Sequence, residues 1–384
     1  MINGKKLIEI RRVGFLNKGA ELMLLAVLEK LKFEYPDAEF VMETARSAPY
    51  KKRALLGFYQ KPGFFRYGIQ FGVFFDFVPS VIKSILGIVT DKQVDIVIDA
   101  AGFAYSDQWG TRNTHELANA CKRSKKNGTK IILMPQAFGP FDNDKNKAHV
   151  KDMIGHVDLF FAREEISYNY LVDIVGERKE LQMAPDFTNL IEGVVPGDFD
   201  KDSNRFCIVP NYRMIDKTSQ KNSDAYLPLM IDITRYVYEK GQKPFILVHE
   251  GDNDLMLAEK IRDAVSPEVQ IIKESDPLKI KGILGVSSGT VGSRFHGLVS
   301  ALSQGTPALA TGWSHKYEML FQDYGFPEGL IDVGTSLEDL YGKIDLIIDN
   351  KSKGEISERI EKKSLLLKER TKCMWKEVMK TIND

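Results

Sequence analysis

The sequence predicts an α/β protein built from two doubly wound, Rossmann-like domains. Short apolar runs recur along the chain and alternate with longer segments of helical periodicity, which is typical of a parallel sheet with helices on both faces. This alternation is interrupted by polar residues and chain breakers at 193–204 and then restarts. With 384 residues, of which 43% are apolar, the chain is long enough to bury two cores.

The first predicted domain covers residues 1–195. Its helices repeat apolar side chains at helical spacing, as Leu22, Leu25 and Leu28 do in the first of them. The expected elements are a strand at 7–10, a helix at 19–32, strands at 40–43 and 95–100, a helix at 115–127, and strands at 130–134 and 157–161.

The second predicted domain covers residues 204–350 and repeats the pattern. Its expected elements are a strand at 206–209, a helix at 226–240, and strands at 244–248, 269–272, 283–286 and 308–310. A charged helix within the C-terminal segment 355–384 is long enough to cross back over the first domain.

The composition excludes several functional classes. Lysine and arginine together number 53, as do aspartate and glutamate, so no overall positive field recruits nucleic acid. The three cysteines at positions 121, 207 and 373 lack the spacing of a zinc site or a disulfide framework. The N-terminus lacks the apolar core and cleavage site of a signal peptide. We therefore expect a cytoplasmic protein with reduced thiols and no bound metal.

The segment from Ser293 to Lys316 concentrates the residues best suited to hold an anion. We expect a short strand at 282–288, Ser293 as the N-cap of a helix, and Arg294 and His296 in its first turn. Gly305 and Pro307 end that helix, and a strand at 308–311 follows. The sequence therefore predicts two cations and two histidines around one helix start.

The chemistry of that helix start favours a phosphate or a carboxylate. Unpaired backbone N–H groups and the positive end of the helix dipole attract anions. Arg294 adds a two-pronged donor and Lys316 a point charge. His296 is the candidate for proton transfer near neutral pH, more as a base than as an acid, and His315 is the reserve candidate. The alternative for Arg294 and His296 is a surface pair with no function.

Several motifs resemble those of the polysaccharide pyruvyl transferase family. The run Ser293-Arg294-Phe295-His296-Gly297, followed by a small-residue helix, a Gly-x-Pro turn and Ser314-His315-Lys316, is similar to the family's C-terminal motif. Four further segments are similar to family landmarks in order and spacing: Gly14 to Glu21, Pro135 to Pro140, Ala162 to Ser167 and Ala184 to Phe187.

The resemblance implies an enzyme that moves pyruvate from phosphoenolpyruvate onto a sugar as a ketal, for a cell-surface polysaccharide or its lipid-linked precursor. It implies the two-domain architecture of B-type glycosyltransferases, with the domains facing across a cleft, the acceptor on the first domain, phosphoenolpyruvate on the second, and the C-terminal helix packed back on the first. The implied catalytic residues are His296, Arg294 and Lys316. The implied substrate-binding residues are Asn17, Gly19, Glu21, Gln136, Arg163, Ser293 and His315. No cofactor is implied besides the donor substrate.

Other readings of individual residues stay open. Arg163 is either a second anion binder or simply paired with Glu164 and Glu165. The cluster His249 to Asp254 is explained by a helix entry capped by Asp252 or Asn253 more readily than by a metal site. The turn after the strand at 95–100 offers acids and aromatic side chains for acceptor recognition: Asp99, Tyr105, Asp107 and Trp109. A nucleotide-sugar glycosyltransferase, with Glu250 holding a ribose, is the alternative function.

The segment Phe64 to Val89 is rich in phenylalanine but is broken by Arg66, Asp76 and Lys83, which excludes a membrane span. Two interpretations remain. It is either an apolar helix packed on the first domain or an interfacial patch that approaches a lipid-linked acceptor at the inner face of the membrane.

Overall fold

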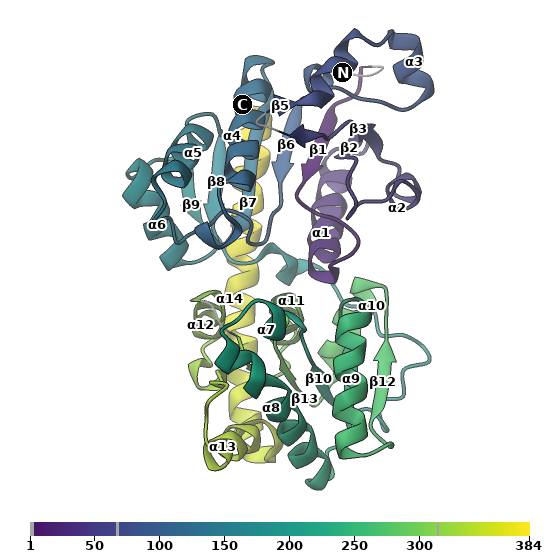
Figure 1. The fold of residues 1–384 in the computed structure, drawn as a ribbon, viewed down its shortest axis with the longest axis vertical. Coiled ribbons are helices and arrows are strands. Elements are labelled where there is room, and N and C mark those ends of the chain that lie inside the picture. The colour runs from purple at the N-terminus through teal and green to yellow at the C-terminus, as the bar shows by residue number, and fades with distance from the viewer. Residues whose placement is uncertain (1–3, 67–68, 313–314) are drawn as a thin grey trace. The chain divides into compact units, whose positions relative to one another are not determined.

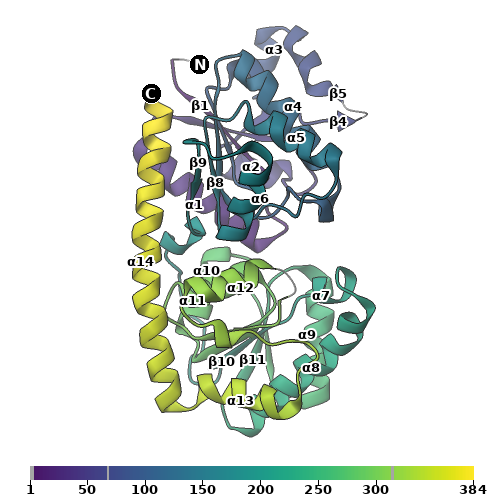
Figure 2. The same ribbon diagram turned by 90° about the vertical axis from the view of Figure 1, so that its left-hand side faces the viewer.

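The computed structural model describes residues 4–66, 69–312 and 315–384, and it divides into two compact units. Unit 1 comprises Met1–Leu16, Met23–Phe187 and Arg370–Asp384, and unit 2 comprises Asn17–Leu22 and Thr188–Glu369. Each unit has its own parallel sheet flanked by helices (Figures 1 and 2). The chain therefore has the predicted fold class, two doubly wound α/β domains.

The sheet of unit 1 has seven parallel strands in the order β3-β2-β1-β6-β7-β8-β9. The central strands are buried along their whole length, which is why they read as nearly continuous apolar runs. The strands are β1 (Leu7–Arg11), β2 (Glu39–Glu43), β3 (Tyr59–Lys61), β6 (Ile96–Asp99), β7 (Lys130–Gln136), β8 (Leu159–Ala162) and β9 (Leu181–Met183).

The helices of unit 1 and a small hairpin complete this domain. The antiparallel pair β4 (Phe65–Arg66) and β5 (Ile69–Gln70) stands apart from the main sheet. The helices are α1 (Lys18–Glu34), α2 (Tyr50–Leu55), η1 (Phe71–Phe77), α3 (Ser80–Ile85), η2 (Asp91–Gln93), η3 (Asp107–Trp109), α4 (Arg112–Lys126), α5 (Asp144–Ile154), α6 (Glu165–Val175) and η4 (Phe187–Leu190), although the first turn of α1 and most of η4 group with unit 2.

The sheet of unit 2 has five parallel strands in the order β12-β11-β10-β13-β14. The strands are β10 (Phe206–Val209), β11 (Pro244–Val248), β12 (Gln270–Lys273), β13 (Gly289–Gly292) and β14 (Ala308–Ala310). The helices are α7 (Arg213–Asp216), α8 (Gln220–Glu239), α9 (Gly251–Val265), α10 (Pro277–Val286), α11 (Phe295–Leu302), α12 (His315–Asp323), η5 (Pro327–Gly329), α13 (Leu337–Ile348) and the first part of α14 (Asn350–Asn383).

Both sheets contain a topological switch point, where the chain leaves one side of the first strand and continues on the other. In unit 1 this point lies between β1 and β6, and in unit 2 it lies between β10 and β13. Ligands of doubly wound sheets bind beyond the carboxyl ends of the strands at such a point. The residues that follow these four strands are therefore the first place to search for a site.

One strand of the second domain was predicted in the wrong place. Residues 283–286 belong to helix α10, and the strand is the following Gly289–Gly292. Asp276 caps α10 by accepting from the Leu278 N–H, and Pro277 begins it, so the apolar residues after them continue a helix. The glycines of β13 are needed because a Cβ on Gly289 would press on the Phe206 ring.

The division between the units falls at Thr188, a few residues before the polar stretch 193–204 where the sequence places the junction. The reason is that residues just after it bond to α10 of unit 2. The Lys281 Nζ donates to the Thr188 carbonyl at 2.7 Å, and the Val194 N–H donates to the Leu278 carbonyl at 2.9 Å.

The phenylalanine-rich segment is not a helix packed on the domain. Neither η1 nor α3 contains a buried residue. The interpretation as a packed apolar helix is therefore wrong. Across the described residues, none of the helices has the length and apolar character needed to cross a bilayer.

Candidate functional site

Ser293 lies directly after β13 and fixes the turn into α11. Its Oγ bonds to the Tyr226 hydroxyl at 2.8 Å and to the Thr311 hydroxyl, and its carbonyl accepts from Asn211 Nδ2 at 2.8 Å and from the Tyr317 hydroxyl at 2.9 Å. The prediction of Ser293 as the N-cap is wrong. Because its hydroxyl is engaged by this internal network, the helix begins one residue later, with Arg294 in extended backbone conformation at the N-cap position.

Arg294 is buried and held by two carboxylates. Its Nε and Nη2 donate to Asp254 Oδ2 at 3.1 and 2.6 Å, and its Nη1 donates to Glu250 Oε2. Asp254 is fully buried and also accepts from the Tyr212 N–H at 2.9 Å. Burial raises the pKa of Asp254, although Arg294 opposes that change. The guanidinium is thus fixed in place at the switch point of unit 2.

Two donors of Arg294 stay available in this arrangement. A guanidinium carries five N–H groups, and three of them are used by Asp254 and Glu250. The described part of the chain supplies no partner for the other two. Helix α11 begins at Phe295, the residue after Arg294. The backbone N–H groups of its first turn have no partner within the helix. Both kinds of donor are suited to an anion.

His249 is a buried histidine beside the start of α11. A Cβ on Gly297 would lie 3.7 Å from His249 Cδ2 and 3.9 Å from its Nε2. Burial lowers the pKa of His249 well below its usual value, and the nearby Arg294 and His296 lower it further. Its Nδ1 is buried and has no partner among the described residues. An unpaired buried polar atom costs about 1–3 kcal/mol, which a bound ligand can recover.

His296 occupies the first turn of α11, half-buried, with its ring edge-to-face with Phe295 at 5.4 Å. The first turn of α1, which groups with unit 2, lies against this imidazole. A Cβ on Gly19 would collide with the His296 ring, so only glycine allows this approach. Gly19 therefore acts through its missing side chain.

Lys316 and His315 form the start of α12. The Lys316 ammonium lies 5.6 Å from the centre of the Phe295 ring and 5.3 Å from that of Tyr317. Phe295 directly follows Arg294, so Lys316 lies near the first residue of α11. Ser314, the first residue of the predicted Ser-His-Lys motif, lies outside the described residues.

Asn17 and Glu21 belong to the start of α1. The Asn17 side chain accepts from the Ala20 N–H at 3.0 Å, as a helix N-cap does, and donates to Glu250 Oε2 at 3.0 Å. Glu21 is paired with Lys18 at 2.7 Å. Glu250 Oε2 thus accepts hydrogen bonds from both Asn17 and Arg294. Glu250 is also the N-cap residue of α9, a position for which Asp252 or Asn253 was predicted.

The two remaining predicted residues, Gln136 and Arg163, lie in unit 1. Gln136 is fully buried at the end of β7, and its Nε2 is 3.4 Å from Asp99 Oδ1. Arg163 is buried and paired with Asp186 at 3.2 Å. Glu164, one of the two acids considered as partners of Arg163, caps α6 by accepting from the Ser167 N–H.

The residues expected to recognise the acceptor are mostly engaged within unit 1. Asp99 and Tyr105 are fully buried and bonded to each other at 2.8 Å. Asp107 accepts from the Asn143 N–H and from Asn146 Nδ2, and Trp109 alone of these four is exposed. Asp99, Tyr105 and Asp107 therefore act first as structural residues.

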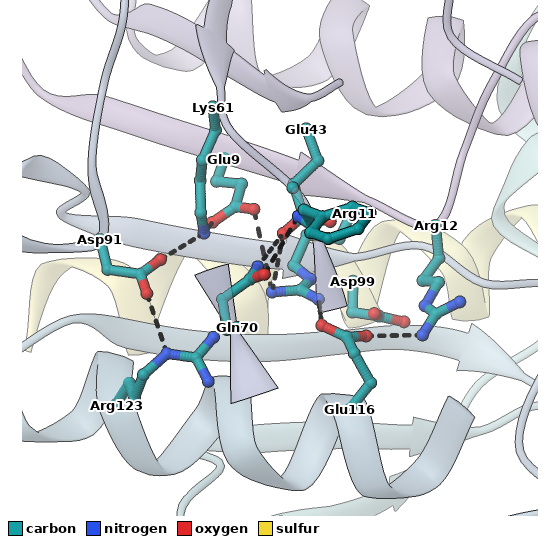
Figure 3. A network of polar contacts seen from close by, with 12 residues as sticks. Glu9, Arg11, Arg12, Glu43, Lys61, Gln70, Asp91, Asp99, Glu116 and Arg123 are labelled. Atoms are coloured by element: carbon teal, nitrogen blue, oxygen red, sulfur yellow. Dashed lines mark hydrogen bonds and ion pairs between the residues drawn. The ribbon is translucent and has the colours of Figure 1, made fainter. Parts of the chain in front are cut away.

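The switch point of unit 1 holds a network of buried ion pairs (Figure 3). Arg11, the last residue of β1, pairs with Glu116 at 2.5 Å, and Arg12 pairs with the other oxygen of Glu116 at 2.6 Å. Arg12 has a φ of 59°, so the chain leaves β1 in the left-handed region. Further pairs join Lys61 to Glu9 at 2.5 Å and to Asp91 at 2.6 Å, and Arg123 to Asp91 at 3.0 Å.

The described residues contain no group of three or more histidine, cysteine, aspartate or glutamate side chains arranged to hold a metal ion. The cluster at 249–254 instead holds Arg294.

Residues 17–315 match the model of one family, described as polysaccharide pyruvyl transferase. The chain belongs to the polysaccharide pyruvyl transferase family. The match includes Asn17 at the start of α1 and Arg294 and His296 at the start of α11.

Among individual relatives, this pyruvyl transferase family member is 24% identical over 291 residues to the amylovoran biosynthesis protein AmsJ of Erwinia amylovora. The match covers 67% of this chain and 66% of AmsJ, so it spans about two thirds of the curated relative's length.

Solved structures of low sequence identity share the fold. A UDP-GlcNAc 2-epimerase from Neisseria meningitidis has a TM-score of 0.60 at 10% identity and covers 98% of this chain and 100% of its own. The S. aureus MnaA structure with UDP has a TM-score of 0.61 at 12% sequence identity, and the match covers 99% of this chain and 97% of MnaA. The structure of Anabaena Alr3699/HepE with UDP and glucose has a TM-score of 0.58 at 12% identity, and the match covers 98% of this chain and 100% of that one. These likenesses establish the B-type glycosyltransferase architecture for the family member.

Sequence reasoning missed how several residues support Arg294 and Ser293. No motif marks Asn211 or Tyr226, and His249 and Asp254 were noted only as parts of a helix entry or a metal cluster. Burial raises the pKa of the Tyr226 hydroxyl to about 12, so it stays protonated as a hydrogen-bonding group. The only available signal was the switch-point rule, which directs attention to the residues after β10 and β11.

Proposed function

We propose that this protein transfers the pyruvyl group of phosphoenolpyruvate to two hydroxyls of a sugar, releasing phosphate and leaving a cyclic ketal. One observation carries the proposal. Arg294 stands at the switch point of unit 2 with two N–H groups beyond those that its acids engage, at the N-cap of α11, and Lys316 lies over the ring of the next residue, Phe295. A small dianion with a carboxylate and a phosphate fits this set of donors.

The binding groups divide naturally between the two ends of phosphoenolpyruvate. The available N–H groups of Arg294 and the first turn of α11 suit one anionic group, and the Lys316 ammonium suits the other. Asp254 and Glu250 hold Arg294 in one orientation, so little side-chain freedom is lost when the donor binds. His249 Nδ1 is a further buried polar atom available to the ligand.

The reaction removes the protons of two sugar hydroxyls and releases phosphate. The first hydroxyl attacks carbon 2 and gives its proton to a base, while the methylene carbon takes up a proton and becomes a methyl group, so in net terms one proton moves from oxygen to carbon. The second hydroxyl then displaces phosphate at carbon 2 and closes the ring, and its proton leaves with the phosphate. His296, at the helix start, is our candidate for proton transfer, and His315 is the reserve. Arg294 and Lys316 stabilise the departing phosphate.

The acceptor belongs to a cell-surface polysaccharide or its lipid-linked precursor in this proposal. The family and the similarity to an amylovoran biosynthesis protein support a polysaccharide acceptor. We place acceptor binding on unit 1, with Gln136 and Arg163 as second-rank substrate-binding residues, and we expect the reaction in the cytoplasm. The remaining residues proposed for substrate binding are Asn17, Gly19, Glu21 and Ser293, acting mainly by positioning Glu250, His296 and Arg294.

The experiment that tests the donor is a thermal-shift titration of the full chain with phosphoenolpyruvate and, separately, with UDP-, GDP- and CMP-sugars. A ligand at about 100 times its dissociation constant adds about 2.7 kcal/mol of stability, which corresponds to a rise of a few degrees. We expect that rise with phosphoenolpyruvate alone. Stabilisation by a nucleotide sugar alone would refute the proposal and establish the alternative, a nucleotide-sugar glycosyltransferase.

A further inference from the structure

The segment from Thr44 to Leu86 of unit 1 presents an apolar surface. Its helices η1 and α3 contain no buried residue, so their apolar side chains are at least partly exposed. Phe77 is 86% exposed and Ile85 is 77% exposed. We call the following exposed residues the apolar ridge: Phe74, Phe75, Phe77, Val81, Ile82, Ile85 and Leu86. Seven large apolar side chains exposed within thirteen residues exceed the scattered exposure that is normal for a soluble domain.

The charge of this segment differs from that of the whole chain. Residues 44–86 contain seven lysines and arginines and one acid, Asp76, in a chain whose formal net charge is zero. Asp76 itself is within 3.3 Å of the Lys92 ammonium. Arg46, Lys51 and Lys52 are exposed, and Lys83 lies within α3. The segment that carries the apolar ridge is therefore cationic, and Lys83 lies within the ridge itself.

A groove of about 620 Å³ joins the cationic and apolar parts of the segment. Its walls include Arg46, Tyr50 and Arg53 from one side and Phe71 and Phe75 from η1. This places residues of α2 beside η1, although they are more than fifteen residues apart in sequence.

Arg53 is the buried cation of this groove. It is only 3% exposed, its Nε donates to the Ala48 carbonyl at 2.8 Å, and its Nη2 is 3.4 Å from Gln60 Oε1. Its Nη1 has no partner, and no carboxylate of the described residues lies within ion-pair distance. Burial lowers the pKa of this guanidinium. A buried arginine donor left open in an aromatic-walled groove suits a phosphate that bears an apolar group.

We propose that the segment 44–86 is a docking surface for an anionic phospholipid bilayer, with the apolar ridge inserted at the interface and a lipid headgroup phosphate in the groove at Arg53. Aromatic and aliphatic side chains flanked by lysine and arginine are typical of surfaces that bind the membrane interface. The core of a protein interface, by contrast, is depleted of lysine. The inference goes beyond the pyruvyl transfer proposed above and does not depend on it.

The test is co-sedimentation of the full chain with vesicles of phosphatidylcholine alone and with vesicles that also contain phosphatidylglycerol. We expect binding to the anionic vesicles that weakens as salt is raised. The double variant Lys51→Glu, Lys52→Glu should lose at least about 25-fold in affinity, since each cation near an anionic surface contributes about fivefold. Phe77→Glu should lose about tenfold by removing one inserted ring, and Arg46→Gln about fivefold.

Matched variants elsewhere control for charge and exposure. Phe33 on α1 is 77% exposed, and Lys362 and Lys363 are adjacent exposed lysines on α14. Phe33→Glu and the double variant Lys362→Glu, Lys363→Glu should bind vesicles as the wild type does. The phosphoenolpyruvate-induced thermal shift of Phe77→Glu should equal that of the wild type, which separates this inference from the donor proposal.

Three results would overturn the docking surface. The first is a wild type that stays in solution with anionic vesicles or binds both vesicle types equally. The second is an equal loss of binding in the control variants. The third is self-association without vesicles that Phe77→Glu abolishes, which would make the ridge an interface between copies of this chain.

Discussion

At the switch point of unit 1 every cation of the ion-pair network has a carboxylate within ion-pair distance, whereas at the switch point of unit 2 the fixed arginine keeps donors for a ligand. Arg11 and Arg12 share Glu116, and Lys61 lies between Glu9 and Asp91 (Figure 3). Arg294 is also held by acids, yet these engage three of its five N–H groups, and it is the N-cap residue of α11.

The two clusters show how a structural charge cluster can be distinguished from a binding site. Both clusters are buried, both follow the central strands of a doubly wound sheet, and both contain arginine. What distinguishes them is their setting: Arg294 is the N-cap residue of α11 with Lys316 near that helix start, whereas Arg11 ends a strand and shares its carboxylates with Arg12 and Lys61. By this criterion we place phosphoenolpyruvate in unit 2 and assign the network of unit 1 to stability.

The largest expected effect is on catalysis at unit 2. His296→Asn should lower turnover about 10²- to 10⁴-fold, because a positioned general acid or base contributes that much. The measurement is phosphate release from phosphoenolpyruvate in the presence of the acceptor, with the donor-induced thermal shift retained. A variant that keeps more than about a tenth of wild-type turnover would exclude His296 as the proton-transfer residue.

The second-largest expected effect is a loss of stability in unit 1. Lys61→Met leaves Glu9 and Asp91 without their shared cation, and burying an unpaired charge costs about 3–5 kcal/mol. Burial would lower the pKa of Lys61, but Glu9 and Asp91 raise it, so the wild-type group is charged. We expect a lower thermal midpoint and an unchanged phosphoenolpyruvate shift.

The double variant Glu9→Gln, Lys61→Met is the matched control for this prediction. It removes both charges of one pair, so it should recover part of the lost stability. If Lys61→Met instead abolished the donor-induced shift in a folded protein, the network of unit 1 would belong to the donor site.

A pH series sharpens the same contrast. Burial alone would raise the pKa of Glu116, but Arg11 and Arg12 lower it from 4.5 to about 2. A depressed carboxylate pKa stabilises the fold above the unfolded-state value, and this contribution is lost as the pH falls from about 4.5 toward about 2. The difference in thermal midpoint between the wild type and Glu116→Gln should therefore be largest near neutral pH and shrink below pH 4.5. A difference independent of pH would contradict the assignment.

The smallest expected effect concerns the start of α1. Asn17→Ala removes a helix N-cap and the contact to Glu250, which costs about 1 kcal/mol. Asn17→Ser keeps a capping side chain, so its free energy of unfolding should stay within a few tenths of a kcal/mol of the wild-type value. Urea unfolding of the three proteins measures the difference, and equal stability of Asn17→Ala and the wild type would show that the cap contributes nothing.

Sequence patterns predicted most of the sheet correctly because parallel strands buried on both faces read as apolar runs. They failed at β13, because its glycines are poor strand formers by propensity and are required only by the close approach of Phe206 and Val209, which leaves no room for a Cβ. They placed Arg294 and His296 at one helix start because the two are close together along the chain, and Lys316 lies over Phe295 between them. They did not predict that Asp254 binds Arg294 or that Asn211 donates to the Ser293 carbonyl. These residues are far apart in sequence and meet only because β10, β11 and β13 are neighbours in the sheet.

The most direct test of the central claim is calorimetric titration of phosphoenolpyruvate into the wild type, Arg294→Ala and Arg235→Ala. Arg235 is a surface arginine of unit 2 paired with Asp232 on α8, so its removal controls for loss of a cation. We predict one donor site in the wild type and in Arg235→Ala, and at least about tenfold weaker binding in Arg294→Ala, because a charge-assisted hydrogen bond contributes about 1.5–3 kcal/mol. Equal affinity in all three proteins would contradict a donor site at the switch point of unit 2.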